Sequence, residues 1–145
     1  MAVPFQTTLM VRDTCLCLAA QRAARALARH FDEALKPLGL TNGQFSLMMA
    51  LNRPAPPSIG SVAALLAMDR TTLTAALKPL ERRDLVVVSV DAQDRRGRRL
   101  SLTAAGAEML AAAVPVWQRH HALIEGRLAS PDDVRSGLSI LADPA

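Results

Sequence analysis

Aromatic side chains are scarce in this chain of 145 residues, which contains no tyrosine, three phenylalanines and one tryptophan. Large rings therefore supply little of the buried surface, although half of the residues are hydrophobic. Length and composition fit one globular domain whose core is built from aliphatic side chains and alanine-rich helix packing.

Cysteine is also rare, since Cys15 and Cys17 are the only two. Two thiols are too few for a disulfide scaffold, so we expect a cytoplasmic protein with reduced thiols. No apolar run approaches the roughly 18 residues needed to cross a bilayer. Near the N-terminus, Arg12 and Asp13 interrupt any signal-peptide core. The sequence predicts no membrane partner.

Residue sets that mark an enzyme are missing as well. We find no serine–histidine–aspartate set, no pair of carboxylates placed for acid–base chemistry and no glycine-rich phosphate loop. The histidines, His30, His120 and His121, do not form a zinc pattern, because adjacent side chains on a helix point to different sides. We expect a protein that is not an enzyme and holds no cofactor or metal.

Positive charge, in contrast, is concentrated in one segment. Over the whole chain, 17 basic residues exceed 13 acidic ones, which gives a net charge of +4. Residues 69–99 include eight basic and five acidic residues, whereas residues 103–145 include three and five. A basic middle followed by an acidic end indicates a module that faces a polyanion, joined to a region with another task.

Hydrophobic spacing predicts three helices in the first half of the chain. An apolar stripe with a period of about 3.6 residues runs through residues 14–38. Thr41 followed by Gln44 is a capping-box pattern, which predicts the start of a second helix. Ser58 precedes a short third helix over residues 59–67.

The fourth predicted helix, residues 70–84, has the most informative face. Asp69 is a good N-cap for it. Three leucines at helical spacing should face inward: Leu73, Leu77 and Leu80. The opposite side then presents small, polar and basic groups: Arg70, Thr71, Thr74, Ala75 and Lys78. Side chains of these types can reach base edges in the major groove of B-DNA.

The segment after this helix predicts a β-hairpin with a cationic tip. The β-branched stretch "LVVVSV" is typical of a strand, and "RLSLT" alternates as its partner. Between them, Gly97 permits a tight reversal and is flanked by Arg95, Arg96, Arg98 and Arg99. Arginines at such a tip can enter the minor groove, where the potential is most negative.

Two further helices follow the hairpin. Thr103 caps a long helix that should extend to about Leu128, with a kink at Pro115. Ser130 at the cap and Pro131 at the first helical position predict the start of a last helix. The predicted fold is therefore mainly α with a small β-hairpin wing, the order of a winged helix-turn-helix.

The stretch "MDRTTLTAALKPLERRDLV" followed by "DAQDRRGRRLSLTAAG" resembles the MarR family of winged-helix transcription regulators. The resemblance implies a homodimer in which N- and C-terminal helices, residues 1–38 and 104–145, form the dimerisation region. Residues 41–103 would form the winged helix-turn-helix DNA-binding lobe. Two symmetric recognition helices would then address half-sites about one helical turn apart on a pseudo-palindromic operator in double-stranded DNA.

The resemblance also implies roles for individual residues. The groove-facing set would be Arg70, Thr71, Thr72, Thr74, Ala75 and Lys78, with Arg95 and Arg98 as contacts at the wing tip. Asp69 and Arg96 match a pair in which the helix cap bonds a wing arginine, so Arg96 would brace the hairpin. Asp84 stands where the family usually has glycine. Because aspartate tolerates a left-handed backbone better than most residues, we expect the turn to form.

Two alternatives for an effector stay open. The stretch "LCLAAQRAARAL" resembles the first-helix cysteine segment of the hydroperoxide-sensing OhrR branch, which suggests an oxidant acting on Cys17, although the activating tyrosines are absent. The other is a small phenolic or carboxylate ligand in the cleft between the dimerisation helices and the DNA-binding lobe. Its lining would be Arg22, Met48, Met49, Trp117 and His120.

Each of these residues also has a structural interpretation, because free cysteines, methionines and tryptophans are often core residues. If Cys15 and Cys17 lie on one helix, their side chains point roughly 200° apart and cannot easily bond each other.

The sequence as a whole predicts a homodimeric, DNA-binding repressor released by a small molecule. Its rivals are a thiol-based redox repressor using Cys17 and an adaptor or enzyme on a winged-helix scaffold.

Overall fold

The computed structural model describes residues 1–143, and over this range the protein is mainly helical with one antiparallel hairpin. The elements in chain order are α1 (Phe5–Thr14), α2 (Leu16–Leu35), the 3₁₀ helix η1 (Lys36–Leu38), α3 (Asn42–Leu51), α4 (Ile59–Leu66), α5 (Arg70–Arg82), β1 (Val86–Val90), β2 (Arg98–Leu102), α6 (Ala104–Glu125) and α7 (Pro131–Ala142). The predicted winged helix-turn-helix order is confirmed.

The N-terminal region differs from the single helix predicted over residues 14–38. Cys15 has extended backbone angles, φ −74° and ψ 109°, and it separates α1 from α2. No local pattern predicted α1, because its apolar side chains do not form a stripe, and none of its residues is buried. Pro37 lies within η1, and Gly39, with φ +69°, ends it.

The predicted helix starts are confirmed by their hydrogen bonds. The Gln44 backbone N–H donates to Thr41 Oγ1 at 3.1 Å, and the Thr41 N–H donates to Gln44 Oε1 at 3.1 Å, so the capping box is complete. The Ser61 N–H donates to Ser58 Oγ at 3.1 Å at the start of α4. Ser130 is the N-cap residue of α7, but its side chain makes no capping bond.

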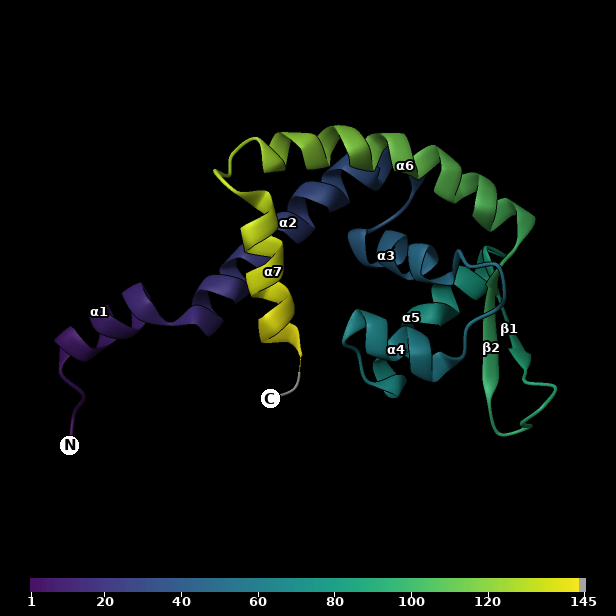
Figure 1. Ribbon diagram of the computed structural model, residues 1–145, viewed down its shortest axis with the longest axis horizontal. Coiled ribbons are helices and arrows are strands. Elements are labelled where there is room, and N and C mark those ends of the chain that lie inside the picture. The colour runs from purple at the N-terminus through teal and green to yellow at the C-terminus, as the bar shows by residue number, and fades with distance from the viewer. Residues whose placement is uncertain (144–145) are drawn as a thin grey trace.

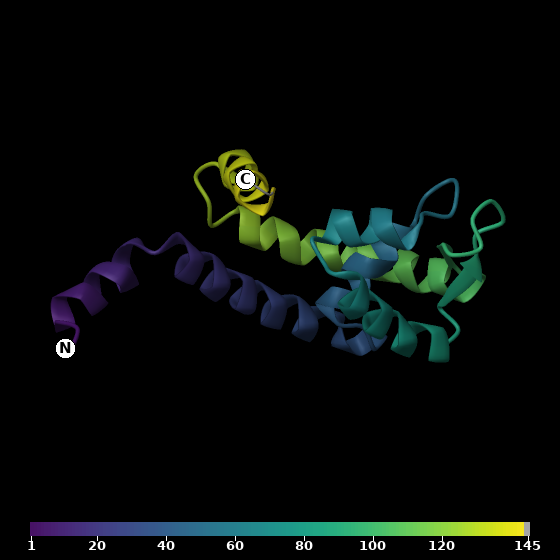
Figure 2. The ribbon, with the colours of Figure 1, turned by 90° about the horizontal axis from the view of Figure 1, so that it is seen from below.

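The hydrophobic core lies where α3, α4 and α5 meet α6 and the hairpin. Figure 1 shows these helices and the hairpin together on one side of α6, while α1 extends away from the body in both Figure 1 and Figure 2. The largest fully buried side chains are aliphatic: Leu35, Leu47, Met48, Val62, Leu73, Leu77, Leu80 and Leu100. This agrees with the expectation of a core that uses few rings.

The hairpin is attached to the helices on two sides. Val86 pairs with Leu102 and Val90 with Arg98, which sets the register. The Leu100 N–H donates to the Pro57 carbonyl at 2.9 Å, so the loop before α4 lies along β2. On the other side, Gly106 in α6 is required, because a Cβ there would overlap the Leu85 carbonyl.

α6 continues through Pro115 to Glu125. It contacts α2 and α3 from the first half of the chain and β2 from the second half. It begins at Thr103, whose Oγ1 accepts the Gly106 N–H at 3.0 Å, as predicted. Across residues 1–143, no helix combines the length and apolarity that a membrane span requires.

Candidate nucleic-acid interface

Helix α5 is held by its N-cap and by one buried face. Asp69 accepts the Thr72 backbone N–H at 2.7 Å and the Thr72 hydroxyl at 2.9 Å. These two bonds stabilise the carboxylate and lower the pKa of Asp69. The three predicted inward residues are confirmed, with 0–1% of their surface exposed: Leu73, Leu77 and Leu80.

The opposite face of α5 is exposed along its whole length. The exposed residues include all of the expected groove-facing set: Arg70, Thr71, Thr72, Thr74, Ala75 and Lys78. Two of the hydroxyl groups are already donating, however, because Thr72 bonds Asp69 and Thr74 bonds the Arg70 carbonyl at 2.8 Å. Among residues 1–143, the donors of this face without a hydrogen-bond partner, and so available for a base edge or phosphate, are on Arg70, Thr71 and Lys78.

The wing tip is ordered by aspartate side chains that accept backbone N–H groups. Asp91 Oδ1 accepts the Gln93 N–H at 2.9 Å, and Asp94 Oδ1 accepts the Arg96 N–H at 3.0 Å. A Cβ at Gly97 would lie 3.3 Å from the Asp94 carbonyl, so a glycine fits this reversal best. The tip is therefore a shaped loop, and three of its arginines are exposed: Arg95, Arg96 and Arg98.

The expected brace between Asp69 and Arg96 is not formed within residues 1–143. Both Asp69 oxygens are occupied by Thr72, and no hydrogen bond or ion pair joins Asp69 to Arg96 in this described range. Arg99 braces the hairpin instead, since its Nε lies 2.9 Å from Asp91 Oδ2 and its Nη1 donates to the Pro56 carbonyl at 3.3 Å. The Gln93 N–H and then Arg99 lower the pKa of Asp91.

Sequence reasoning grouped Arg99 with the tip arginines and did not give it this role. The position of Arg99 in the alternating strand could have indicated this role. Arg99 is half-buried and pairs with Ser89, which lies two residues before Asp91 at the start of the loop. Arg98, in contrast, folds back over the tip and donates to the carbonyls of Arg95 at 3.2 Å and Gly97 at 3.1 Å.

The turn after α5 forms as predicted for Asp84. Its φ is +59°, a left-handed conformation in which glycine is favoured and aspartate is tolerated. The Asp84 carbonyl accepts the Thr103 hydroxyl at 2.6 Å, and the Leu85 N–H donates to the Leu80 carbonyl at 3.0 Å. The first bond joins the turn after α5 to the N-cap of α6, and the second closes the end of α5.

The residues expected to line one effector cleft lie in separate places. Met48 is fully buried in the core. Met49 and Trp117 line a pocket of about 370 Å³ between α3 and α6, whereas Arg22 lines a shallow depression made by α2 alone. The prediction of a single shared cleft is therefore wrong for these residues, because helical spacing does not tell which side of a packed helix a residue faces.

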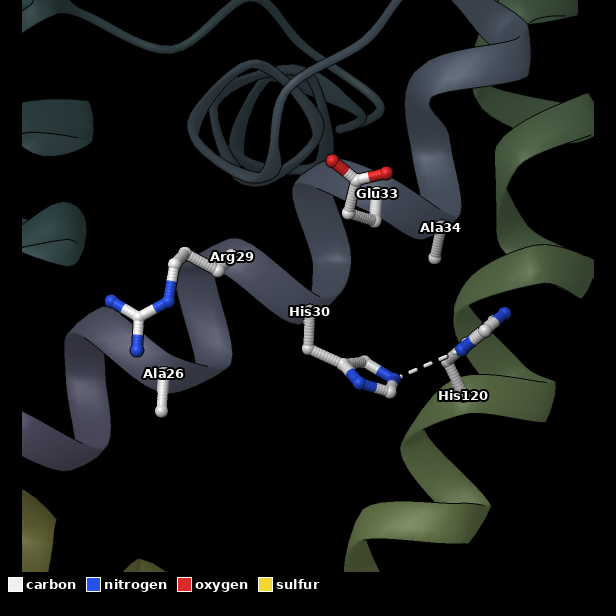
Figure 3. A pocket seen from close by; sticks show the side chains of 6 residues that line it. All are labelled: Ala26, Arg29, His30, Glu33, Ala34 and His120. Carbon is white, nitrogen blue, oxygen red and sulfur yellow. Dashed lines mark hydrogen bonds between the residues drawn. The ribbon is translucent and has the colours of Figure 1, made fainter.

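His120 lies in a different, open depression of about 630 Å³ between α2 and α6. Its Nδ1 is 2.9 Å from His30 Nε2, as Figure 3 shows, and the side chains of Arg29 and Glu33 point away from this pair. Nowhere in residues 1–143 do three or more histidine, cysteine or acidic side chains come together as metal ligands.

The two cysteines are not arranged as two positions of one helix. Cys15 is the half-buried N-cap of α2, and its Sγ accepts the Leu18 N–H at 3.4 Å. Cys17 is exposed in the first turn, and Gln21 Nε2 donates to its Sγ at 3.2 Å. The angle of roughly 200° expected for two helical positions therefore does not apply here.

Comparison with known proteins identifies the family. A model described as the MarR family matches residues 38–97, which include α3, α4, α5 and most of the wing. A crystal structure of the transcriptional regulator MosR of Mycobacterium tuberculosis in complex with DNA is 37% identical, with a TM-score of 0.82. That similarity covers 88% of this chain and 93% of MosR. The chain belongs to the MarR family.

Two more relatives from this MarR group are informative. The transcriptional repressor CouR, bound to a 23-mer DNA duplex, is 30% identical with a TM-score of 0.75, over 91% of this chain and 93% of CouR. The repressor NicR of Pseudomonas putida is 33% identical over 66% of this chain and 60% of NicR. The chain thus spans less than two thirds of the length of the curated relatives that it matches.

Proposed function

We propose that this MarR-family chain is a homodimeric transcription repressor that binds a pseudo-palindromic site in double-stranded DNA in the cytoplasm. A small-molecule effector would release it from this site. The observation that carries the proposal is the pairing of two cationic surfaces on one lobe. The free donors of α5 and the arginines of the wing tip lie on elements that sit together on one side of α6.

The geometry of the lobe suits a duplex. A helix about 10 Å wide fits the major groove, so α5 would present Arg70, Thr71 and Lys78 to base edges and flanking phosphates. The wing would then place Arg95 and Arg98 at the adjacent minor groove or backbone. Repulsion among the tip arginines is relieved when phosphates arrive, which favours binding at low salt. Two relatives, MosR and CouR, were solved with DNA, which supports this partner.

We expect a second copy of the chain to cover the exposed apolar side chains of the outer helices, α1 and α7. Neither α1 nor α7 has a buried residue, and isolated helices of 10–12 residues are unstable in water. Several of their apolar side chains are more than 40% exposed: Phe5, Met10, Val11, Val134, Leu138, Ile140 and Leu141. We propose that residues 1–38 and 104–145 form the dimer and residues 41–103 the DNA-binding lobe; residues 144 and 145 lie outside the described range.

The groove that the partner would fill is visible in a single chain. Residues of α2, α6 and α7 line an apolar groove of about 500 Å³, including Leu16, Leu27, Ile124, Val134 and Leu138. If helices of both copies pack around this groove, the lobes of the two copies would be connected rigidly. The two α5 helices, one in each copy, would then have a fixed separation. An effector would release DNA by binding more tightly to a state with a different separation.

The proposal is tested by selecting duplexes from a random pool with the full-length protein. We expect a two-fold-symmetric consensus, and we expect two chains per duplex by native mass spectrometry. Selection without enrichment, or an asymmetric site bound by one chain, would contradict the proposal. Adding simple phenolic acids to the complex then tests the effector class, with release at an unchanged salt concentration as the expected result.

A second candidate for the release signal is an oxidant acting on Cys17. The observation that favours it is the exposure of Cys17, together with the hydrogen bond that Gln21 Nε2 donates to its sulfur. Iodoacetamide labelling at neutral pH should modify Cys17 in the folded protein, and diamide should weaken DNA binding by the wild type but not by Cys17→Ser. A thiol that reacts only after unfolding would end this candidate.

A further inference from the structure

The C-terminal end of the recognition helix α5 is tied to the end of α2 by one side chain. Arg83, the C-cap of α5, donates from Nη1 to the Gly39 carbonyl at 2.7 Å, across 44 residues of sequence. A Cβ at Gly39 would lie 3.3 Å from Arg83 Nη2, so the guanidinium lies directly over this glycine. The contact joins the DNA-binding lobe to the helix that leads into the proposed dimer.

The carbonyl that Arg83 binds has a well-defined position. Gly39 has φ +69°, and its N–H donates to the Lys36 carbonyl at 2.9 Å. The next N–H, of Leu40, donates to the carbonyl of Leu35, the last residue of α2, at 3.3 Å. These two bonds hold Gly39 to η1 and to the end of α2.

The α5 side of the contact is equally well fixed. The left-handed turn at Asp84 follows Arg83 directly, and its carbonyl accepts the Thr103 hydroxyl at 2.6 Å. The Thr103 N–H also donates to the Leu85 carbonyl at 3.0 Å. The end of the recognition helix is thus joined to α6 through Thr103 and to α2 through Arg83.

We propose that Arg83 is a positioning residue for DNA binding, which sets the orientation of α5 relative to α2 and does not itself contact DNA. Two fixed points at its C-terminal end, together with its buried leucine face, set the direction in which the exposed face of α5 points. In a dimer built on α2 and α6, that direction sets the separation of the two recognition helices. This inference rests on the proposed function above.

An exposed arginine at the end of a recognition helix has an obvious rival role as a phosphate contact. The two roles differ in their salt dependence. Loss of a phosphate contact makes the slope of log affinity against log salt shallower by about 0.9 and weakens all duplexes alike. Loss of a positioning contact weakens the selected duplex more than a shuffled one and leaves the slope unchanged.

The experiment compares full-length wild type, Arg83→Ala and the matched control Arg82→Ala, which removes the same charge one residue earlier. Fluorescence anisotropy gives the affinity for a duplex selected by the wild type and for a shuffled duplex, between about 50 and 300 mM salt. For Arg83→Ala we expect about a five- to tenfold loss on the selected duplex, less than about a twofold loss on the shuffled one and an unchanged slope. For Arg82→Ala we expect no loss of preference.

Several results would overturn the role of Arg83: a shallower slope, an equal loss on both duplexes, the same loss of preference in Arg82→Ala, or no loss at all. If Arg83→Ala does not fold by circular dichroism, Arg83→Lys takes its place, because lysine keeps the charge but lacks the planar fork. Its expected result is a smaller loss of preference with the same slope. A wild type that prefers no duplex overturns the proposed function and this inference together, whereas an unchanged variant beside a selective wild type overturns the inference alone.

Discussion

The lobe that we propose binds DNA, residues 41–103, and the outer helices use their apolar residues in opposite ways. In the lobe, α3, α4 and α5 bury aliphatic side chains that include Leu47, Val62 and Leu77. In the outer helices α1 and α7, most apolar residues are exposed and none is buried. The lobe therefore buries its apolar residues within one chain, whereas the outer helices leave an apolar surface that fits the proposed second copy.

The largest expected effect comes from the core of the lobe. Leu77→Ala removes a side chain that is 1% exposed at the centre of the recognition helix. We expect it to lower the free energy of unfolding by about 2–5 kcal/mol, because it leaves a cavity as well as lost burial. Urea denaturation at low protein concentration measures this change.

The matched control for that variant is Leu138→Ala in α7, where the leucine is 49% exposed. At the same low concentration it should change the unfolding of the lobe by less than about 0.5 kcal/mol. If both variants lowered the free energy of unfolding equally, α7 would contribute as much to the stability of one chain as the core of the lobe does. That result would contradict the comparison between the two regions.

The second prediction concerns the surface between two copies. Ile140 is 75% exposed, and Ile140→Glu would place a charge in a buried interface if α7 packs against a partner. We expect the dimer dissociation constant to rise by about a hundredfold, as measured by sedimentation velocity. Val87→Glu, an exposed apolar residue of the hairpin, is the control and should leave dimerisation unchanged. A dimer unaffected by Ile140→Glu would place the interface elsewhere.

The third prediction addresses charge on the lobe. Arg98→Ala should weaken binding to all duplexes by about fivefold and make the salt slope shallower by about 0.9, because one phosphate contact is lost. Arg119→Ala, at an exposed position of α6, removes the same charge from the outer region and should change neither quantity. Unchanged affinity of Arg98→Ala at two salt concentrations would count against the wing as a DNA contact.

The smallest effect is expected at the cap of α5. Asp69→Ala removes the hydrogen bonds to Thr72 and should lower Tm by about 3 °C at neutral pH. The pKa of Asp69 is depressed in the folded protein, from an ordinary value of 3.8. Its stabilisation is therefore fully present above about pH 3.8 and is lost as pH falls through the lower folded value.

The difference in stability between wild type and Asp69→Ala should accordingly be constant from about pH 5 to 8 and shrink below pH 4. Arg96→Ala should leave Tm unchanged, because Arg96 does not bond Asp69. If each of Asp69→Ala and Arg96→Ala lowered Tm equally, and the double variant lowered it no further, a brace between the two residues would be supported instead.

Much of the lobe could be predicted from local signals. Thr41 with Gln44, Ser58 and Asp69 mark helix starts because each side chain satisfies a backbone N–H within three residues. The leucine spacing of α5 predicts its buried face for the same local reason. The hairpin followed from β-branched residues and an arginine-rich turn, so the order of elements needed no knowledge of distant contacts.

The site was less predictable where it depends on contacts between distant segments. The bond from Arg83 to Gly39 and that from Arg99 to Pro56 each join positions more than 40 residues apart, and no local pattern indicates them. The assumed effector cleft failed for the same reason, since Met48 and Arg22 face opposite environments once the helices pack. The break at Cys15 was not predicted because no proline or glycine marks it.

Two lobes, joined by the outer helices, should bind one duplex together. Hydroxyl-radical footprinting of the full-length protein on a selected duplex, combined with the mass of the complex, tests this arrangement. We expect two chains per duplex and two protected regions about one helical turn apart, related by two-fold symmetry. A single protected region bound by one chain would contradict it.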